Sequence, residues 1–339
     1  MQLTAMPLDL RLVHPFGIAR GTETVAHSLV VRVRAGEREG LGESAPSARY
    51  GESVASALAG LRALPPLGDD PFALQTLLAA DGPYALAPAA RCALDVALHD
   101  LIGKALGRPL WQLFGLEPVR TPVTSFTLGI DAPETMLAKL EEIREHPIVK
   151  VKLGFPGDLE VLAAIRARYT GTLRVDANEG WTFDEALRKL PELERLDVEF
   201  CEQPIAAGEP AALRALRECA HVPIVADEDA RCASDLAALH GCVDGVNVKL
   251  VKCGGLRAGL EMIHAARALG MKVMLGCMVE SAILCTAAAH LSPLVDWADL
   301  DGPFLTAHDP FEGLRYEGGK IVLPPGPGLG VVERAAAAR

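Results

Sequence analysis

The sequence has 339 residues, of which 33 are basic and 44 are acidic, so its formal net charge at pH 7 is −11. Half of the residues are hydrophobic, which is enough for the core of one large α/β domain or of two domains. The acidic balance argues against nucleic acids and membrane surfaces as partners, because both attract basic patches. No apolar run approaches the roughly 18 residues that a membrane-spanning helix requires.

The N-terminus and the cysteines both indicate a cytoplasmic protein. The chain starts with alternating apolar and polar residues and lacks the basic start and the long apolar stretch of a signal peptide. Its eight cysteines are scattered and include no CxxC pair. This pattern is typical of reduced, packed thiols and excludes a disulfide scaffold.

The first third of the chain is predicted to be an α+β unit of residues 1–115. Period-two alternation and turn signals predict strands at 2–12, 28–34 and 40–46. Helix formers then dominate, and they predict helices at 53–63, 72–79 and 89–105. Gly107 and Pro109 end the last of these helices.

From Thr121 onward a strand, a loop and a helix alternate with a period of about 25 residues. Eight such units predict a (β/α)8 barrel over residues 116–310, an α/β fold. An open, doubly wound sheet would need the same alternation, but no glycine-rich phosphate loop follows the first strand. The predicted strands cover residues 122–129, 148–154, 173–180, 198–204, 223–228, 245–250, 272–278 and 295–302.

Charged and polar residues follow six of these strands at their carboxyl ends. In a barrel these ends meet at one mouth, where active sites are built. Residues two apart on a strand point the same way, so Lys150 and Lys152 project together, as do Asp176 and Asn178. The residues concerned are Lys150 and Lys152, Asp176 and Asn178, Glu202, Asp227 and Glu228, Lys249 and Lys252, and Asp299 and Asp301.

Asp176, Glu202 and Asp227 come from three consecutive strands and offer only carboxylate oxygens. Such hard ligands suit Mg²⁺, with Mn²⁺ as the alternative, and leave positions open for substrate and water. Zinc is disfavoured, because Cys201 next to Glu202 would point to the opposite side of its strand.

Lysines flank this triad on the second and sixth strands. A neighbouring cation and partial desolvation lower the pKa of a lysine and allow it to act as a base. One lysine could then remove the α-proton of a metal-bound carboxylate, and the metal and Lys150 would hold the charge of the resulting enediolate. A second lysine could return a proton to the other face, as in a racemase or epimerase.

Several ordered motifs resemble the muconate-lactonizing subgroup of the enolase superfamily. They are KVK at 150–152, VDANEGW at 175–181, EQP at 202–204, ADE at 226–228 and KCGG at 252–255. The resemblance implies that residues 1–115 form a capping domain and that residues 311–339 return to it. It also implies roles for single residues: Asp176, Glu202 and Asp227 as Mg²⁺ ligands, Lys152 and Lys252 as the acid/base pair, and Lys150 as an auxiliary cation near the substrate carboxylate.

The sequence ADLDGP at 298–303 selects among the reactions of this subgroup. Asp299 and Asp301 project to one spot and could bind a cation from two sides. In related proteins this pattern marks the dipeptide epimerases, in which the two carboxylates hold the α-ammonium group of the substrate. The alternative interpretation is that one of the two aspartates caps the following helix.

Two loops of the capping unit, at 18–24 and 47–53, resemble specificity loops of the same epimerases. Arg20, or else Arg49, could pair with an acidic side chain of the substrate, because the guanidinium fork fits a carboxylate. Thr127 matches a family threonine near the substrate. We therefore expect an enzyme that inverts the α-carbon of the C-terminal residue of a dipeptide. L-Ala-L/D-Glu is the first candidate substrate, and the resemblance implies murein peptides as its source.

Other functions remain open on the sequence alone. Within the subgroup they are o-succinylbenzoate synthase, N-acylamino acid racemase and muconate cycloisomerase, none of which needs an ammonium site. A non-catalytic binding barrel would be expected to lack a ligand or a base, and none is missing here. Barrels of this size commonly pack into symmetric assemblies, so a homo-oligomer is compatible with the sequence.

Overall fold

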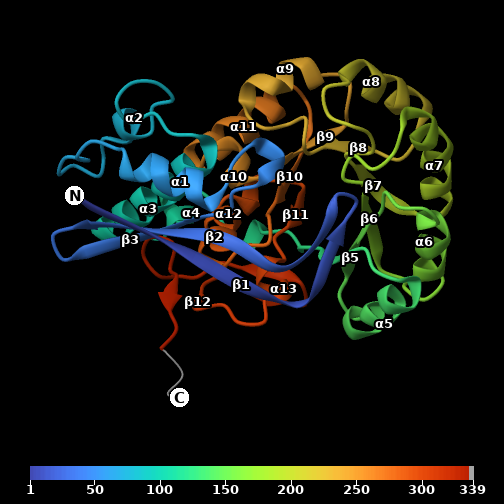
Figure 1. Cartoon of the computed structure of the whole chain (residues 1–339), viewed down its shortest axis with the longest axis horizontal. Coiled ribbons are helices and arrows are strands. Elements are labelled where there is room, and N and C mark those ends of the chain that lie inside the picture. The colour runs from blue at the N-terminus through green and yellow to red at the C-terminus, as the bar shows by residue number, and fades with distance from the viewer. Residues whose placement is uncertain (336–339) are drawn as a thin grey trace.

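The computed structural model describes residues 1–335 and begins with a three-stranded antiparallel sheet next to a group of helices (Figure 1). Residues 336–339, the end of the predicted segment 311–339, lie outside the described part. Alternate residues of the middle strand, Leu29, Val31 and Val33, are fully buried, as period-two patterning requires. The elements of this unit are β1 (Gln2–Ile18), β2 (Gly21–Ala35), β3 (Arg38–Ser44), α1 (Val54–Arg62), α2 (Leu74–Leu77), α3 (Pro88–Leu106) and α4 (Leu110–Leu113).

Two glycines allow α3 to lie directly on β3. A Cβ atom at Gly40 or Gly42 would overlap the carbonyl oxygen of Ala97 or Ala93 on the helix. Side chains at these two positions would push the helix away from the sheet. The pair therefore fixes the distance between the two layers of the N-terminal unit.

The N-terminal unit differs from the prediction at two places. The predicted loop at 18–24 is the tip of a long hairpin, because β1 continues to Ile18 and β2 starts at Gly21. The helix predicted at 72–79 is only the short α2. Near the turn, residues 13–15 and 21–24 are all exposed, so this part of the hairpin lacks the alternation that signals a strand.

The next part of the chain forms the predicted (β/α)8 barrel. Eight strands pair in parallel and in chain order, and a parallel bridge between Thr124 and Ala298 joins the last strand to the start of the first. The backbone N–H of Ser125 donates to the carbonyl of Ala298 at 3.1 Å and completes the closure. The strands are β4 (Phe126–Leu128), β5 (Ile148–Lys152), β6 (Thr172–Asp176), β7 (Val198–Glu202), β8 (Ile224–Ala226), β9 (Gly245–Val248), β10 (Lys272–Gly276) and β11 (Trp297–Asp299).

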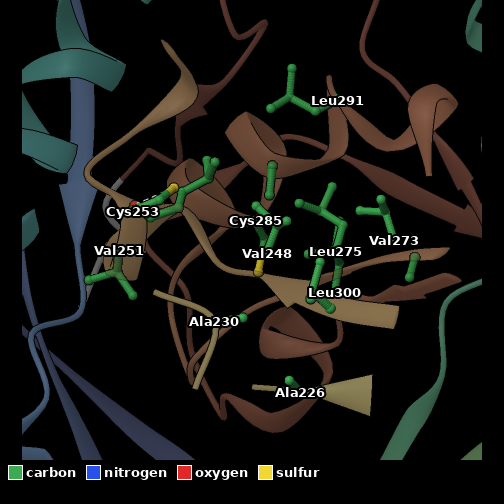
Figure 2. Packing of buried hydrophobic residues seen from close by; sticks show 14 of the residues in the cluster. Ala226, Ala230, Val248, Val251, Cys253, Val273, Leu275, Cys285, Leu291 and Leu300 are labelled. Atoms are coloured by element: carbon green, nitrogen blue, oxygen red, sulfur yellow. Dashed lines mark hydrogen bonds between the residues drawn. The ribbon is translucent and has the colours of Figure 1, made fainter. Parts of the chain in front are cut away.

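Helices surround the barrel on its outside, as Figure 1 shows for α5 to α8. Their apolar faces and the outward side chains of the strands form one core, part of which appears in Figure 2, where Val248, Leu275 and Leu300 lie together. The helices are α5 (Pro133–Ile143), α6 (Asp158–Arg166), α7 (Phe183–Arg195), α8 (Pro210–Cys219), α9 (Leu236–Leu239), α10 (Leu250–Cys253), α11 (Leu256–Ala268), α12 (Ala282–Ala289) and α13 (Gly302–Leu305).

The segment after the barrel contains short strands and contacts the N-terminal unit. Asp100 of α3 accepts hydrogen bonds from the backbone N–H groups of Leu41 and Leu329, at 2.7 and 2.8 Å. The strands are β12 (Phe311–Glu312), β13 (Arg315–Glu317), β14 (Lys320–Val322) and β15 (Val332–Glu333). Within residues 1–335, none of the helices is both long and apolar enough to cross a membrane.

Buried acids of the N-terminal unit bind the N-termini of two barrel helices. Asp95 of α3 accepts from the backbone N–H groups of Leu256 and Arg257 at 2.6 and 3.3 Å, at the start of α11. Glu43 of β3 accepts from those of Ser281 and Leu284 at 3.0 and 3.1 Å, at the start of α12. Because the first N–H groups of a helix have no partner within the helix, these carboxylates supply it from outside.

An Asp95→Ala variant is expected to lower the free energy of unfolding by about 3 kcal/mol, because it leaves two buried N–H groups of α11 without an acceptor. Thermal or denaturant unfolding measures this change. Asp184→Ala is the matched control, since Asp184 is an exposed acid in the first turn of α7 and its loss should cost about 1 kcal/mol or less. Equal losses in the two variants would contradict the capping role of Asp95.

Candidate functional site

The three predicted metal ligands lie side by side at the mouth of the barrel. Asp176 ends β6 and Glu202 ends β7, and the two are direct partners in the parallel register. Asp227 follows β8, and all three side chains are at most 1% exposed. Burial and the neighbouring Asp176 carboxylate raise the pKa of Glu202, which shows how closely the negative charges are packed.

The lysines at the end of β5 neutralise part of this charge. The Nζ atom of Lys150 lies 2.6 Å from Glu202 Oε2, 2.7 Å from Asp299 Oδ2 and 3.3 Å from Asp176 Oδ2. Lys152 donates to Asp176 Oδ2 at 2.6 Å. Burial alone would raise the pKa of Asp176, but the two ammonium groups outweigh it and lower that pKa.

The triad fits a hard divalent cation. The opposite oxygens are held in place by amide donors: Asp176 Oδ1 by the backbone N–H of Asn178 at 2.8 Å, and Glu202 Oε1 by Asn247 Nδ2 at 2.6 Å. Within residues 1–335, the inner oxygen Glu202 Oε2 faces the Lys150 ammonium group. Three carboxylates, two of them with outer oxygens held by amide donors, match the ligand preferences of Mg²⁺.

Lys249 and Lys252 both contact Asp227, but in different ways. Lys249 follows β9 directly and donates one hydrogen bond, to Asp227 Oδ2 at 2.9 Å. Lys252 lies in α10 and donates three, to Asp227 Oδ1 at 2.5 Å, to the carbonyl of Asp227 at 2.7 Å and to that of Asn247 at 2.9 Å. The side chain of Lys252 is 0% exposed, whereas Lys249 and Lys152 are 8% and 9% exposed.

The two aspartates at the carboxyl end of β11, Asp299 and Asp301, have separate partners. Asp299 Oδ2 binds Lys150, and its Oδ1 accepts from Ser125 Oγ at 2.5 Å. Asp301 Oδ2 accepts only from the backbone N–H of Thr127, at 2.7 Å. Burial and the Asp299 carboxylate raise the pKa of Asp301 to about 6, while Lys150 overcomes burial and lowers that of Asp299 to about 2. Within residues 1–335, Asp301 therefore forms no ion pair, whereas Asp299 pairs with Lys150.

The hairpin tip of the N-terminal unit reaches the same mouth. Arg20 donates to the carbonyl of Asn178 and to Glu179 Oε2, both at 2.9 Å, and lies 2.8 Å from Glu228 Oε1. Arg49, from the second loop, binds both oxygens of Glu179 at 2.7 Å. Arg20 thus contacts the loops after β6 and β8, whereas Arg49 contacts only the first of them.

Two residues that hold the metal ligands in place, Gln203 and Asn247, were not predicted from the sequence. Gln203 Oε1 accepts from the backbone N–H of Asp227 at 2.9 Å, and Asn247 orients Glu202. Asn247 is two residues before Lys249, so the alternation of β9 could have placed it on the inner face. Gln203 belongs to the EQP motif and adopts a positive φ of 32°.

Comparison with known proteins places both parts of the chain in described families. Residues 3–115 match the N-terminal domain of the mandelate racemase / muconate lactonizing enzyme family, and residues 135–337 match the enolase C-terminal domain-like family. An L-Ala-D/L-Glu epimerase of Bacteroides thetaiotaomicron is 37% identical over 337 residues, which cover 98% of this chain and 88% of that protein.

Solved structures agree with this relationship. A substrate-liganded L-Ala-D/L-Glu epimerase from Bacillus subtilis superposes with a TM-score of 0.93 at 28% identity, covering 99% of both chains. A dipeptide epimerase from Methylococcus capsulatus, in complex with Mg and L-Arg-D-Lys, superposes with a TM-score of 0.91 at 34% identity. This match covers 98% of the present chain and 99% of the other.

Proposed function

The chain belongs to the mandelate racemase / muconate lactonizing enzyme family of the enolase superfamily and is an isomerase, and on this premise we propose that it is a Mg²⁺-dependent dipeptide epimerase. The reaction inverts the α-carbon of the C-terminal residue. The observation that carries the proposal is Asp301, a buried carboxylate that forms no ion pair within residues 1–335 and lies near the lysines and the carboxylate triad. An α-ammonium group is the cation that this position suits.

The residues of this chain supply proton transfer on both faces of the substrate. Lys152 contacts Asp176 and Lys249 contacts Asp227, so the two amines stand on opposite flanks of the triad. One amine removes the α-proton, and the other, as ammonium, returns a proton to the opposite face. Lys150 lies between these flanks and offsets the negative charge that develops on the substrate carboxylate. When bound, Mg²⁺ supplies further positive charge there.

We assign the second base to Lys249 instead of Lys252, which the sequence motif implied. A base must present its nitrogen to the substrate, and a lysine with three protein acceptors and no exposed surface does not. Lys249 has a single acceptor and an exposure like that of Lys152. In this assignment Lys252 holds Asp227 in position.

Deuterium exchange tests the proposed reaction. The Mg²⁺-loaded protein is incubated in D₂O with a library of L,L-dipeptides and, in parallel, with N-acylated amino acids, and label is located by mass spectrometry. Deuterium at the α-carbon of the C-terminal residue is the expected result. A Lys152→Ala, Lys249→Ala double variant serves as the control and should give no exchange. Exchange of N-acylated amino acids only would replace the proposal by an N-acylamino acid racemase.

An Arg20→Met variant is expected to lower kcat/KM for L-Ala-L-Glu by about tenfold, the loss of one partly exposed ion pair with the substrate side chain. For L-Ala-L-Leu, the kcat/KM of the same variant should stay within about twofold of that of the unchanged enzyme. Arg49→Met is the matched control, because Arg49 binds Glu179 but not Glu228. An equal loss on both dipeptides would remove Arg20 from side-chain recognition.

A further inference from the structure

A second cluster of ligand-type side chains lies beside the catalytic mouth and takes no part in the proposed reaction. The ligand atoms of Cys277, Glu280 and Cys285 all lie within 4.8 Å of one another. Within residues 1–335, this is the one group of three or more histidine, cysteine or acidic side chains that is so compact. The cluster connects the loop after β10 with the first turn of α12.

Two separations in and beside this cluster match those between neighbouring ligands of a tetrahedral metal site. Cys285 Sγ lies 3.6 Å from Glu280 Oε1, and Cys277 Sγ lies 3.8 Å from Asp301 Oδ1. Bond lengths of about 2.3 Å for Zn–S and about 2.1 Å for Zn–O, at a tetrahedral angle, place neighbouring ligand atoms about 3.6–3.8 Å apart. Both of these separations are therefore close to those that a bound ion would impose on neighbouring ligands.

Burial of the cluster also favours a cation. Glu280 is 2% exposed and forms no ion pair with the lysines, arginines or histidines of residues 1–335. Its carboxyl group accepts hydrogen bonds from the Cys285 thiol and from the backbone N–H of Met278, at 3.6 and 3.2 Å. Cys285 is packed close to Val248 and Leu275 in the apolar core (Figure 2), whereas Cys277 is partly exposed and gives access from the mouth.

We propose that Cys277, Glu280 and Cys285 bind a soft divalent cation such as Zn²⁺, with Asp301 as the fourth ligand. Thiolates select Zn²⁺ over Mg²⁺, so this site and the carboxylate triad discriminate between the two ions. Binding replaces the thiol protons, which leave to solvent, and involves no change of oxidation state. Because Asp301 cannot bind the ion and an ammonium group together, the ion excludes the dipeptide; this last consequence rests on the proposed function.

Cadmium titration tests the site directly. The reduced full-length protein, with its triad saturated by Mg²⁺, is titrated with Cd²⁺ while the ultraviolet thiolate-to-cadmium charge-transfer band and the bound metal are measured. One equivalent should bind and give the band. Cys277→Ser and Cys285→Ala should each weaken Cd²⁺ binding by at least about tenfold. Cys219→Ser, at an exposed cysteine of α8, is the matched control and should bind like the unchanged protein.

Two results would overturn the proposal: no charge-transfer band in the unchanged protein, or undiminished binding in both ligand variants. Cys277 is partly exposed, so Cys277→Ser keeps the test valid even where the buried Cys285→Ala fails to fold. A saturating dipeptide should weaken Cd²⁺ binding. If a dipeptide that the enzyme epimerises leaves Cd²⁺ binding unchanged, the bound ion does not exclude the dipeptide, and that part of the proposal is overturned. Failure of deuterium exchange in the Mg²⁺-loaded, Cd²⁺-free controls would instead count against the proposed reaction alone.

Discussion

A Lys249→Met variant is expected to lose dipeptide epimerisation by on the order of 10²–10⁴-fold and still to exchange the α-proton of one of the two diastereomers. Removal of one base leaves Lys152 on the other flank of the triad. That lysine can still remove and return a proton on its own face, so only the isomer whose α-hydrogen points toward it exchanges. Proton NMR of the L,L and L,D isomers in D₂O measures both rates, and Lys152→Met should show the opposite preference.

Lys252→Met is the matched control for this experiment. Its ammonium group binds the Asp227 carboxylate and two carbonyl oxygens, so its loss should weaken Mg²⁺ binding and slow exchange of both isomers alike. Calorimetric titration with Mg²⁺ separates this effect from loss of a base. If Lys252→Met exchanges the α-proton of only one isomer and Lys249→Met exchanges neither, the second base is Lys252.

An Asp301→Asn variant is expected to lower kcat/KM for dipeptides by at least about 30-fold, corresponding to the 2–5 kcal/mol lost when one partner of a buried, hydrogen-bonded charge pair is removed. The carbonyl oxygen of asparagine can still accept from the Thr127 N–H, so the backbone should stay in place. Any turnover of N-acylated amino acids, which carry no ammonium group, should change little. Steady-state kinetics with both substrates gives the ratio.

Asp299→Asn provides the contrast to Asp301→Asn. Asp299 binds Lys150, and its replacement disturbs the cation beside the triad whichever substrate is used. We therefore expect a loss on dipeptides and N-acylated substrates alike. An equal loss on both substrates in Asp301→Asn would show that Asp301 supports the site generally and does not recognise the ammonium group.

The barrel and the mouth could be predicted because each repeat carries its own signal. Asp176 and Glu202 end their strands, and parallel pairing makes them neighbours without any long-range information. The same rule brought Lys150 and Asp299 to one rim, although they are far apart in sequence. The sequence did not reveal that these two residues pair with each other, because register across the closing strands is set by packing.

The position of a residue after a strand was not enough to choose between Lys249 and Lys252 as the second base. Both lysines follow the sixth barrel strand, but the chain turns into α10 immediately after Lys249. After this turn, Lys252 lies next to Asp227 and donates to the backbone carbonyls of Asp227 and Asn247. In the proposed assignment, the position of that turn distinguishes Lys249, which faces the substrate, from Lys252, which holds Asp227. The position of Arg20 was equally hidden, since it depends on the length of the β1–β2 hairpin.

The buried acids Asp95 and Glu43 also bear on the order in which the protein is made. The ribosome adds both residues long before it adds α11 and α12. The acceptors for these helix N-termini are therefore already present when the helices form. The N-termini of two late barrel helices thus take their hydrogen-bond acceptors from the part of the chain that is synthesised first. We therefore expect these helices to be stabilised only when the N-terminal unit is already in place.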